Sequence, residues 1–141
     1  MNVLKRVITV LLVLCLSVCA VGCAEEKYDE YDNFKPAGVL IIDCLTGKQY
    51  ETHIDDEKYA NIMFNAFEEL TIDTKTEGEV GSAYLYMRFY DEDQSTMVIF
   101  TIYDNGSCCL GEDFTEYYTV ENGRQKYIDL CELYEEYVPK N

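Results

Sequence analysis

The stretch AYLYMRFYDEDQSTMVIFTIYDNGSCCL, residues 83–110, decides the fold. Its first eight residues alternate aliphatic or phenylalanine side chains with tyrosines and an arginine, and the later run MVIFTIYD is apolar on both faces. A period of two, with many aromatic and β-branched residues, predicts two strands. The dipeptide Asn105-Gly106 is typical of a two-residue hairpin turn, so SCCL is predicted to return as a third antiparallel strand.

Before this stretch, residues 38–45 form a short apolar, β-branched run that predicts a strand. A three-residue loop over residues 45–47, with glycine in the left-handed position, would join it to a second strand over residues 49–54. In that register one face of the hairpin carries Leu40, Ile42, Cys44, Tyr50, Thr52 and Ile54.

Two amphipathic helices are predicted, one before the central strands in the sequence and one after them. The first begins after the N-cap Asp55, because the acids that follow suit the positive end of a helix dipole. Residues 71–82, which contain two glycines, are predicted to be loop. The last helix begins at Asn122, after a short strand over residues 117–120. The apolar stripes of the two helices have helical spacing; they are Tyr59, Ile62, Met63, Ala66, Phe67 and Leu70, and then Tyr127, Leu130, Cys131, Tyr134, Tyr137 and Val138.

The order of elements is therefore β-β-α-β-β-β(β)-α. Hairpin-joined strands with an inserted helix predict the α+β class, as a two-layer sandwich. The sheet is expected to be mainly antiparallel, with about five to six strands and two helices packed on it. We expect a single domain over residues 36–141, beginning at Pro36.

The N-terminus has the parts of a secretory signal peptide. Lys5 and Arg6 precede an uncharged, almost wholly apolar run over residues 7–21. This run is shorter than the about 20 apolar residues that a transmembrane helix needs. Residues 1–22 are therefore predicted to direct export and to be removed.

The residues Ala20-Val21-Gly22-Cys23 resemble the lipobox of bacterial lipoproteins, in which a small residue precedes an invariant cysteine. The resemblance implies a diacylglycerol on the sulfur of Cys23 and a lipid-anchored protein on the extracytoplasmic face of the cell membrane. Ordinary secretion, with cleavage at the same bond and no lipid, is the alternative. The order of elements also resembles the small α+β domains of unknown function in lipoproteins of Gram-positive-type bacteria.

The chain after the leader is strongly acidic. The leader takes Lys5 and Arg6 but no acid, so nine of the eleven lysines and arginines remain against all 27 acids, a net charge of −18. Such a charge argues against nucleic acid and anionic lipid surfaces as partners, since both attract basic patches. The acid-rich residues 23–35 are predicted to be a tether between the membrane and the domain.

The sequence has no recognisable catalytic constellation. His53 is the only histidine, and the serine, lysine and zinc motifs of common hydrolases are absent. Four cysteines follow Cys23, and we expect one disulfide or none among them. No cofactor or metal is predicted, and the chain is predicted not to be an enzyme. An envelope enzyme that uses surface carboxylates, such as those of Asp91 and Asp93, is the alternative.

Tyr84, Tyr86, Arg88 and Tyr90 form the candidate binding face, because they lie opposite the apolar face of their strand. Three interpretations are open: the C-terminal helix covers these residues, a protein partner binds them, or a glycan stacks on them. Tyrosine and arginine are enriched in interface cores. The sequence therefore predicts a non-catalytic binding module at the cell envelope, with an envelope protein or a glycan as its ligand.

Overall fold

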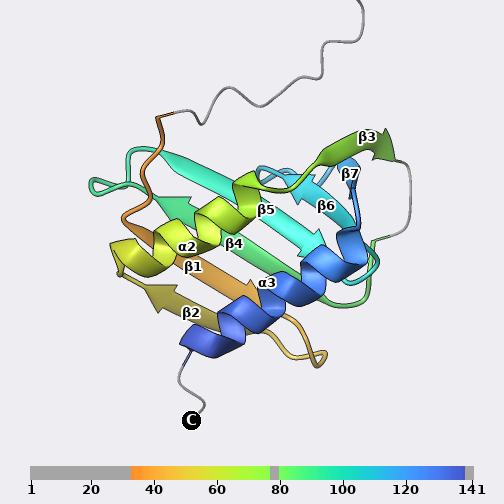
Figure 1. The fold of residues 1–141 in the computed structure, drawn as a ribbon, viewed down its shortest axis with the longest axis horizontal. Coiled ribbons are helices and arrows are strands. Elements are labelled where there is room, and N and C mark those ends of the chain that lie inside the picture. The colour runs from red at the N-terminus through yellow and green to blue at the C-terminus, as the bar shows by residue number, and fades with distance from the viewer. Residues whose placement is uncertain (1–32, 77–79, 139–141) are drawn as a thin grey trace, which may run out of the picture. The chain divides into compact units, whose positions relative to one another are not determined.

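Seven strands and two helices make up the part of the chain that the computed structural model describes, residues 33–76 and 80–138 (Figure 1). The α+β class with a mainly antiparallel sheet is confirmed, although the expected number of strands was too low. The strands are β1 (Gly38–Asp43), β2 (Tyr50–Ile54), β3 (Ile72–Thr76), β4 (Tyr84–Tyr90), β5 (Met97–Tyr103), β6 (Ser107–Leu110) and β7 (Tyr117–Val120), and the helices are α2 (Glu57–Glu68) and α3 (Gly123–Tyr137).

The strands form one sheet in the order β2-β1-β4-β5-β6-β7-β3, and every pair is antiparallel. Both helices lie on the same face of this sheet, side by side (Figure 1). The segment containing α2 carries the chain from the β2 edge to the β3 edge, and β4 to β7 then follow one another from the middle of the sheet outward. The molecule therefore has one helix-covered face, and the described residues place no helix on the other.

Aromatic rings fill the space between α2 and the sheet. The rings of Phe64 and Phe67 on α2 lie 5.1 Å and 6.4 Å from the ring of Phe89, and Phe67 is 4.7 Å from Phe100. Phe89 and Phe100 are fully buried. Period-two alternation puts further apolar residues of β1, β4 and β5 on the same side; they include Val39, Ile41, Leu85, Met87, Val98 and Ile102, all of them buried.

The predicted register of the first hairpin was wrong by one residue. Ile41 pairs with Thr52 and Asp43 with Tyr50, so the loop spans residues 44–49 rather than 45–47. A shift of one residue moves every side chain to the opposite face. The longer loop brings Ile41 under the helices and lets Asp43 meet α3, a contact that local turn patterns do not reveal.

The prediction that residues 71–82 form only a loop was also wrong, because β3 lies there. It pairs with β7 at the sheet edge, and a register irregularity falls between Ile72 and Lys75. The backbone N–H of Glu121 donates to the carbonyl of Thr71, which fastens the start of this strand. An edge strand has only one partner and one half-buried face, so its sequence, IDTKT, carries little apolar periodicity.

The helix caps differ in detail from the expected ones. The N-cap of α2 is Asp56, whose Oδ1 accepts from the backbone N–H of Tyr59 at 2.9 Å, and not Asp55. Asp55 instead accepts a hydrogen bond from the hydroxyl of Tyr90. Asn122 does occupy the N-cap position of α3, but its backbone is left-handed and its side chain makes no capping bond.

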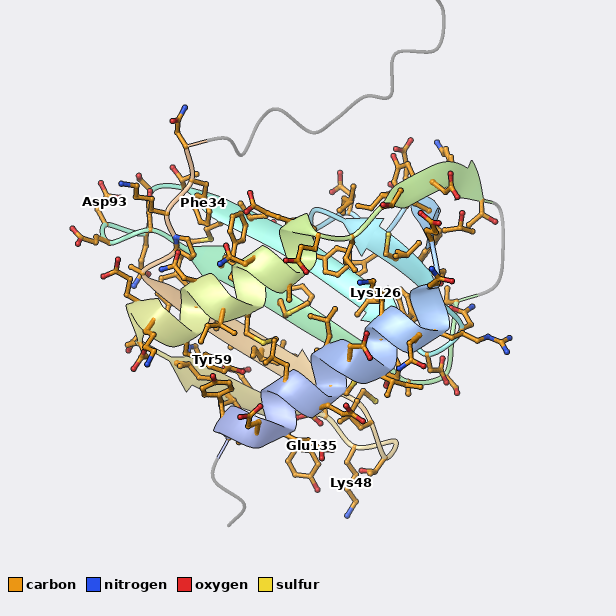
Figure 2. The ribbon with its side chains drawn as sticks, viewed as in Figure 1. Phe34, Lys48, Tyr59, Asp93, Lys126 and Glu135 are labelled. Atoms are coloured by element: carbon orange, nitrogen blue, oxygen red, sulfur yellow. The ribbon has the colours of Figure 1, made fainter. Side chains whose placement is uncertain are left out.

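The predicted signal peptide over residues 1–22, Cys23, and the tether up to residue 32 lie outside the described residues. The ring of Phe34 packs 5.2 Å from that of Phe64, at the end of the sheet where Asp93 also lies (Figure 2). Neither α2 nor α3, the helices of the described part, combines the length and apolar content needed to cross a membrane.

A small polar cluster is buried beneath α3. The hydroxyl of Tyr134 donates to Oδ2 of Asp43 at 2.7 Å and lies 3.1 Å from Oγ1 of Thr52. Asp43 and Tyr134 are both buried. The nearby ring of Tyr59, which reaches from α2 toward the end of α3, lies 4.8 Å from that of Tyr137 (Figure 2). These contacts tie both helices and the β1–β2 hairpin together.

The tyrosines make the fold sensitive to alkaline pH. Burial raises the pKa of Tyr90, Tyr103 and Tyr134 to about 12, with added effects from Asp55 on Tyr90, neighbouring Tyr117 on Tyr103, and Asp43 on Tyr134. A raised folded-state pKa contributes stability that is complete below the unfolded value of about 10 and is lost as pH rises toward 12. We therefore expect the thermal unfolding midpoint to fall progressively above pH 10. Circular dichroism with a parallel tyrosinate absorbance titration measures this, and a midpoint that stays constant through that range would contradict it.

Candidate functional site

The face of the sheet opposite the helices, here called the second face, carries the candidate binding residues. The strand registers align Arg88 with Leu40 and Ile99 across it, and they align Tyr86 with Thr101. The interpretation that α3 covers this face is wrong, because α3 lies beside α2 on the opposite face (Figure 1). Tyr134 of α3 bonds there to Asp43 and lies 3.1 Å from Oγ1 of Thr52. The buried residues of both helices lie on the helix-covered side of the sheet, so neither α2 nor α3 covers the second face.

Tyr86 and Arg88 are brought together at the middle of this face. They are two residues apart on β4, so their side chains point the same way. The guanidinium carbon of Arg88 lies 5.8 Å from the centroid of the Tyr86 ring, and Nε donates to the tyrosine hydroxyl at 3.1 Å. The distance to the centroid is near the outer limit of a cation–π contact, so the hydrogen bond to the hydroxyl is the contact that positions the guanidinium. Tyr86 is buried, while about a third of the Arg88 side chain, 35 %, remains exposed.

Tyr84 and Tyr90 lie at the two ends of β4 and belong to other contacts. The hydroxyl of Tyr84 accepts from the side-chain amide of Gln49, and its ring is 5.9 Å from that of Tyr103. Tyr90 bonds to Asp55 at the start of α2. The four predicted residues therefore share a face, but only Tyr86 and Arg88 contact one another.

The loop between β6 and β7, residues 111–116, covers part of the second face. The ring of Phe114 stacks on Tyr86 with centroids 6.2 Å apart, and the carboxylate of Glu112 lies 3.5 Å from the guanidinium of Arg88. The N–H of Gly111 donates to the carbonyl of Ile99 at 2.9 Å. Sequence reasoning missed this loop as part of the site. The only local signal was an isolated aromatic residue in a polar, glycine-led segment.

Two polar groups lie buried at the centre of the second face, although neither α2 nor α3 covers them. Thr101 is 1 % exposed, and its hydroxyl has no hydrogen-bond partner among the described residues. Cys109, which pairs with Thr101 across the strands, is fully buried. Burial raises the pKa of its thiol, and hydrogen bonds from the backbone of Phe114 and Glu116 oppose that rise. The loop is therefore in direct contact with one of these two groups.

The backbone of Phe114 is strained. Its φ of 46° is left-handed, a conformation that costs a bulky residue on the order of 1 kcal/mol. The ring remains 43 % exposed, so burial offsets only part of that cost. Phe114 keeps this strained backbone although its ring is only partly buried over Tyr86 and beside Arg88. Strain that packing does not offset is typical of a functional position.

Asp91 and Asp93, the carboxylates of the alternative enzyme hypothesis, accept hydrogen bonds within the β4–β5 turn. Asp91 accepts from the backbone N–H of Thr96 and from the hydroxyl of Ser95, and Asp93 accepts from the N–H of Ser95. The backbone bond from Thr96 lowers the pKa of Asp91. These contacts close the β4–β5 turn, whose outermost residues include Asp93 (Figure 2).

The other titratable candidates are dispersed. His53 is exposed and pairs with Glu51 at 2.7 Å. The four cysteines of the described part are free thiols, namely Cys44, Cys108, Cys109 and Cys131. Over residues 33–76 and 80–138, no group of three or more histidine, cysteine, aspartate or glutamate side chains is arranged to hold a metal ion.

A hollow of about 600 Å³ lies at the N-terminal end of α3, between the turn at Asn105-Gly106 and Arg124. Gly106 and Gly123 approach so closely there that a Cβ on Gly123 would overlap the carbonyl of Gly106. The buried hydroxyl in its lining, that of Ser107, is bonded to Asn105. The hollow is accounted for by the packing of the helix end against the turn.

No protein-family model, no curated protein and no solved structure matches this chain.

Proposed function

We propose that the protein is a membrane-anchored extracytoplasmic lipoprotein whose domain is a non-catalytic binding module for a protein partner at the cell envelope. The binding role is supported by one observation: the second face has a row of aromatic residues that no described helix covers. A half-exposed antiparallel sheet normally has one polar face. Here Tyr86 and Arg88, residue types enriched at interface hot spots, lie at its centre.

The arrangement of Arg88 favours recognition by contact. Its guanidinium is already oriented by the hydroxyl of Tyr86, so little side-chain entropy remains to be lost on binding. It is the only lysine or arginine among the strand positions described on this face. A single oriented cation beside aromatic rings favours a specific contact over a diffuse electrostatic one.

The proposed location rests on the leader. The lipobox-like Ala20-Val21-Gly22-Cys23 favours lipid on Cys23, and two acyl chains anchor a protein stably where one does not. A tether of acidic residues would then hold the domain away from an anionic membrane surface.

The anchor is tested by the intact mass of the protein extracted from membranes of the source cell. We expect a chain that starts at Cys23 and carries the added mass of a diacylglycerol, and we expect Cys23→Ser to leave the protein uncleaved and unlipidated. Alkylation of the same sample counts the free thiols, of which the described domain has four. A mature chain with an unmodified Cys23, or with a different first residue, would overturn the lipoprotein assignment.

A further inference from the structure

The β6–β7 loop meets the second face through two contacts that have the form of a ligand's contacts. Glu112 and Phe114 are two residues apart in the loop, and the residues that they meet, Arg88 and Tyr86, are two residues apart on β4. A carboxylate thus lies on the guanidinium, and an aromatic ring lies on the ring beside it. The loop therefore supplies, from the same chain, a carboxylate to Arg88 and an aromatic ring to Tyr86.

Both contacts are weakly held. The Glu112 side chain is mostly exposed and its oxygen is 3.5 Å from Arg88, a geometry typical of surface ion pairs that are screened by water. Phe114 is left-handed and only partly buried. The loop also begins at Gly111, whose φ of 80° gives the chain a residue that tolerates large backbone changes. The segment is therefore suited to being displaced from the face.

The group at the centre of the face has no partner of its own. The hydroxyl of Thr101 is buried between Tyr86 and Cys109 and has no hydrogen-bond partner among the described residues. Buried polar groups are almost always paired, and an exception requires an explanation. A ligand backbone laid across the same strands would supply the missing bond.

We propose that the β6–β7 loop occupies the site of a protein partner, and that the partner presents a carboxylate followed two residues later by an aromatic side chain. The carboxylate replaces Glu112 on Arg88, and the ring replaces Phe114 on Tyr86. Arg88 thereby exchanges the carboxylate of Glu112 for that of the partner. Its guanidinium has a negatively charged neighbour in the free state and in the bound state. This inference rests on the proposed binding function and names the chemistry of its partner.

A peptide with the loop's own sequence, GEDFTE, is the probe. Its binding to the full-length protein in detergent is measured by fluorescence anisotropy. We expect Phe114→Ala to bind the peptide up to about fivefold more tightly than the unaltered protein, because the competing ring has been removed from the site. Adding Arg88→Gln to that variant should weaken binding by about fivefold, the range of an exposed ion pair.

Matched controls distinguish this effect from nonspecific binding of the peptide. Ile128→Ala removes an equally exposed apolar side chain from α3 and should bind like the unaltered protein. Peptides with alanine in place of the glutamate or the phenylalanine should bind more weakly. Equal binding of all three peptides, or no gain from Phe114→Ala in a protein of unchanged circular dichroism, would overturn the proposal.

Two further outcomes identify a different occupant. If the unaltered protein is a dimer in solution and Phe114→Ala makes it monomeric, the loop of a second copy occupies the face and the proposal of a separate partner is overturned. If a partner cross-links to the second face in cells but the peptide does not bind Phe114→Ala, the motif is overturned while the binding function stands.

Discussion

Replacement of Phe89 by alanine is expected to lower the free energy of unfolding by about 3–5 kcal/mol, because it leaves a cavity in the middle of the helix-covered layer. The ring is fully buried and packs against those of Phe64 and Phe67. A domain of this size has about 5–15 kcal/mol of stability in total, so a large part would be lost. Chemical denaturation of the full-length protein, followed by circular dichroism, measures the change.

Phe114→Ala is the matched control, since it makes the same substitution on the other face. Its ring is 43 % exposed and its backbone is left-handed, so we expect a change within about 1 kcal/mol. Similar losses for the two variants would contradict the assignment of one layer packed under α2 and α3 and a second face that these two helices leave uncovered.

Tyr134→Phe is expected to cost about 1–3 kcal/mol, the penalty for leaving a buried polar group without its hydrogen bond. The substitution keeps the ring and removes only the hydroxyl, which donates to Asp43 at 2.7 Å and lies 3.1 Å from Thr52. Asp43 is buried, so water cannot readily replace the lost donor. The same denaturation experiment measures the loss.

Tyr137→Phe on the same helix provides the comparison. Its ring contacts Tyr59, but the residue is 43 % exposed, so removal of its hydroxyl should change stability by less than about 0.5 kcal/mol. An equally small effect at Tyr134 would show that the bond to Asp43 does not hold α3 to the sheet.

The central part of the fold was predictable because its signals are local. Period-two alternation identified β4, and helical spacing identified α2 and α3. The Asn105-Gly106 dipeptide identified the β5–β6 hairpin, but the expected two-residue loop was wrong: Ile102 pairs with Cys108, so the loop spans residues 104–106. What could not be predicted depends on residues far apart in the chain. β3 is a strand paired with β7, and the observed register of β1 and β2 places Asp43 where it accepts a hydrogen bond from Tyr134, 91 residues along the chain.

The candidate site was predictable only in part, for the same reason. Alternation along β4 puts Tyr86 and Arg88 on the face opposite Phe89, and the structure has them there in contact. Strand alternation alone does not show on which face of the sheet α3 packs. The role of Phe114 arises from a loop that folds back over strands distant in sequence, so no spacing rule could identify it.

Site-specific photo-cross-linking in living cells tests most directly whether the second face is the binding surface. A photoreactive amino acid is placed at position 97, on the second face, or at position 128, on α3; Met97 and Ile128 are equally exposed, at 45 %. We predict a reproducible cross-linked protein from position 97 that is absent from position 128. Cross-links from both positions alike, or from neither, would contradict the account.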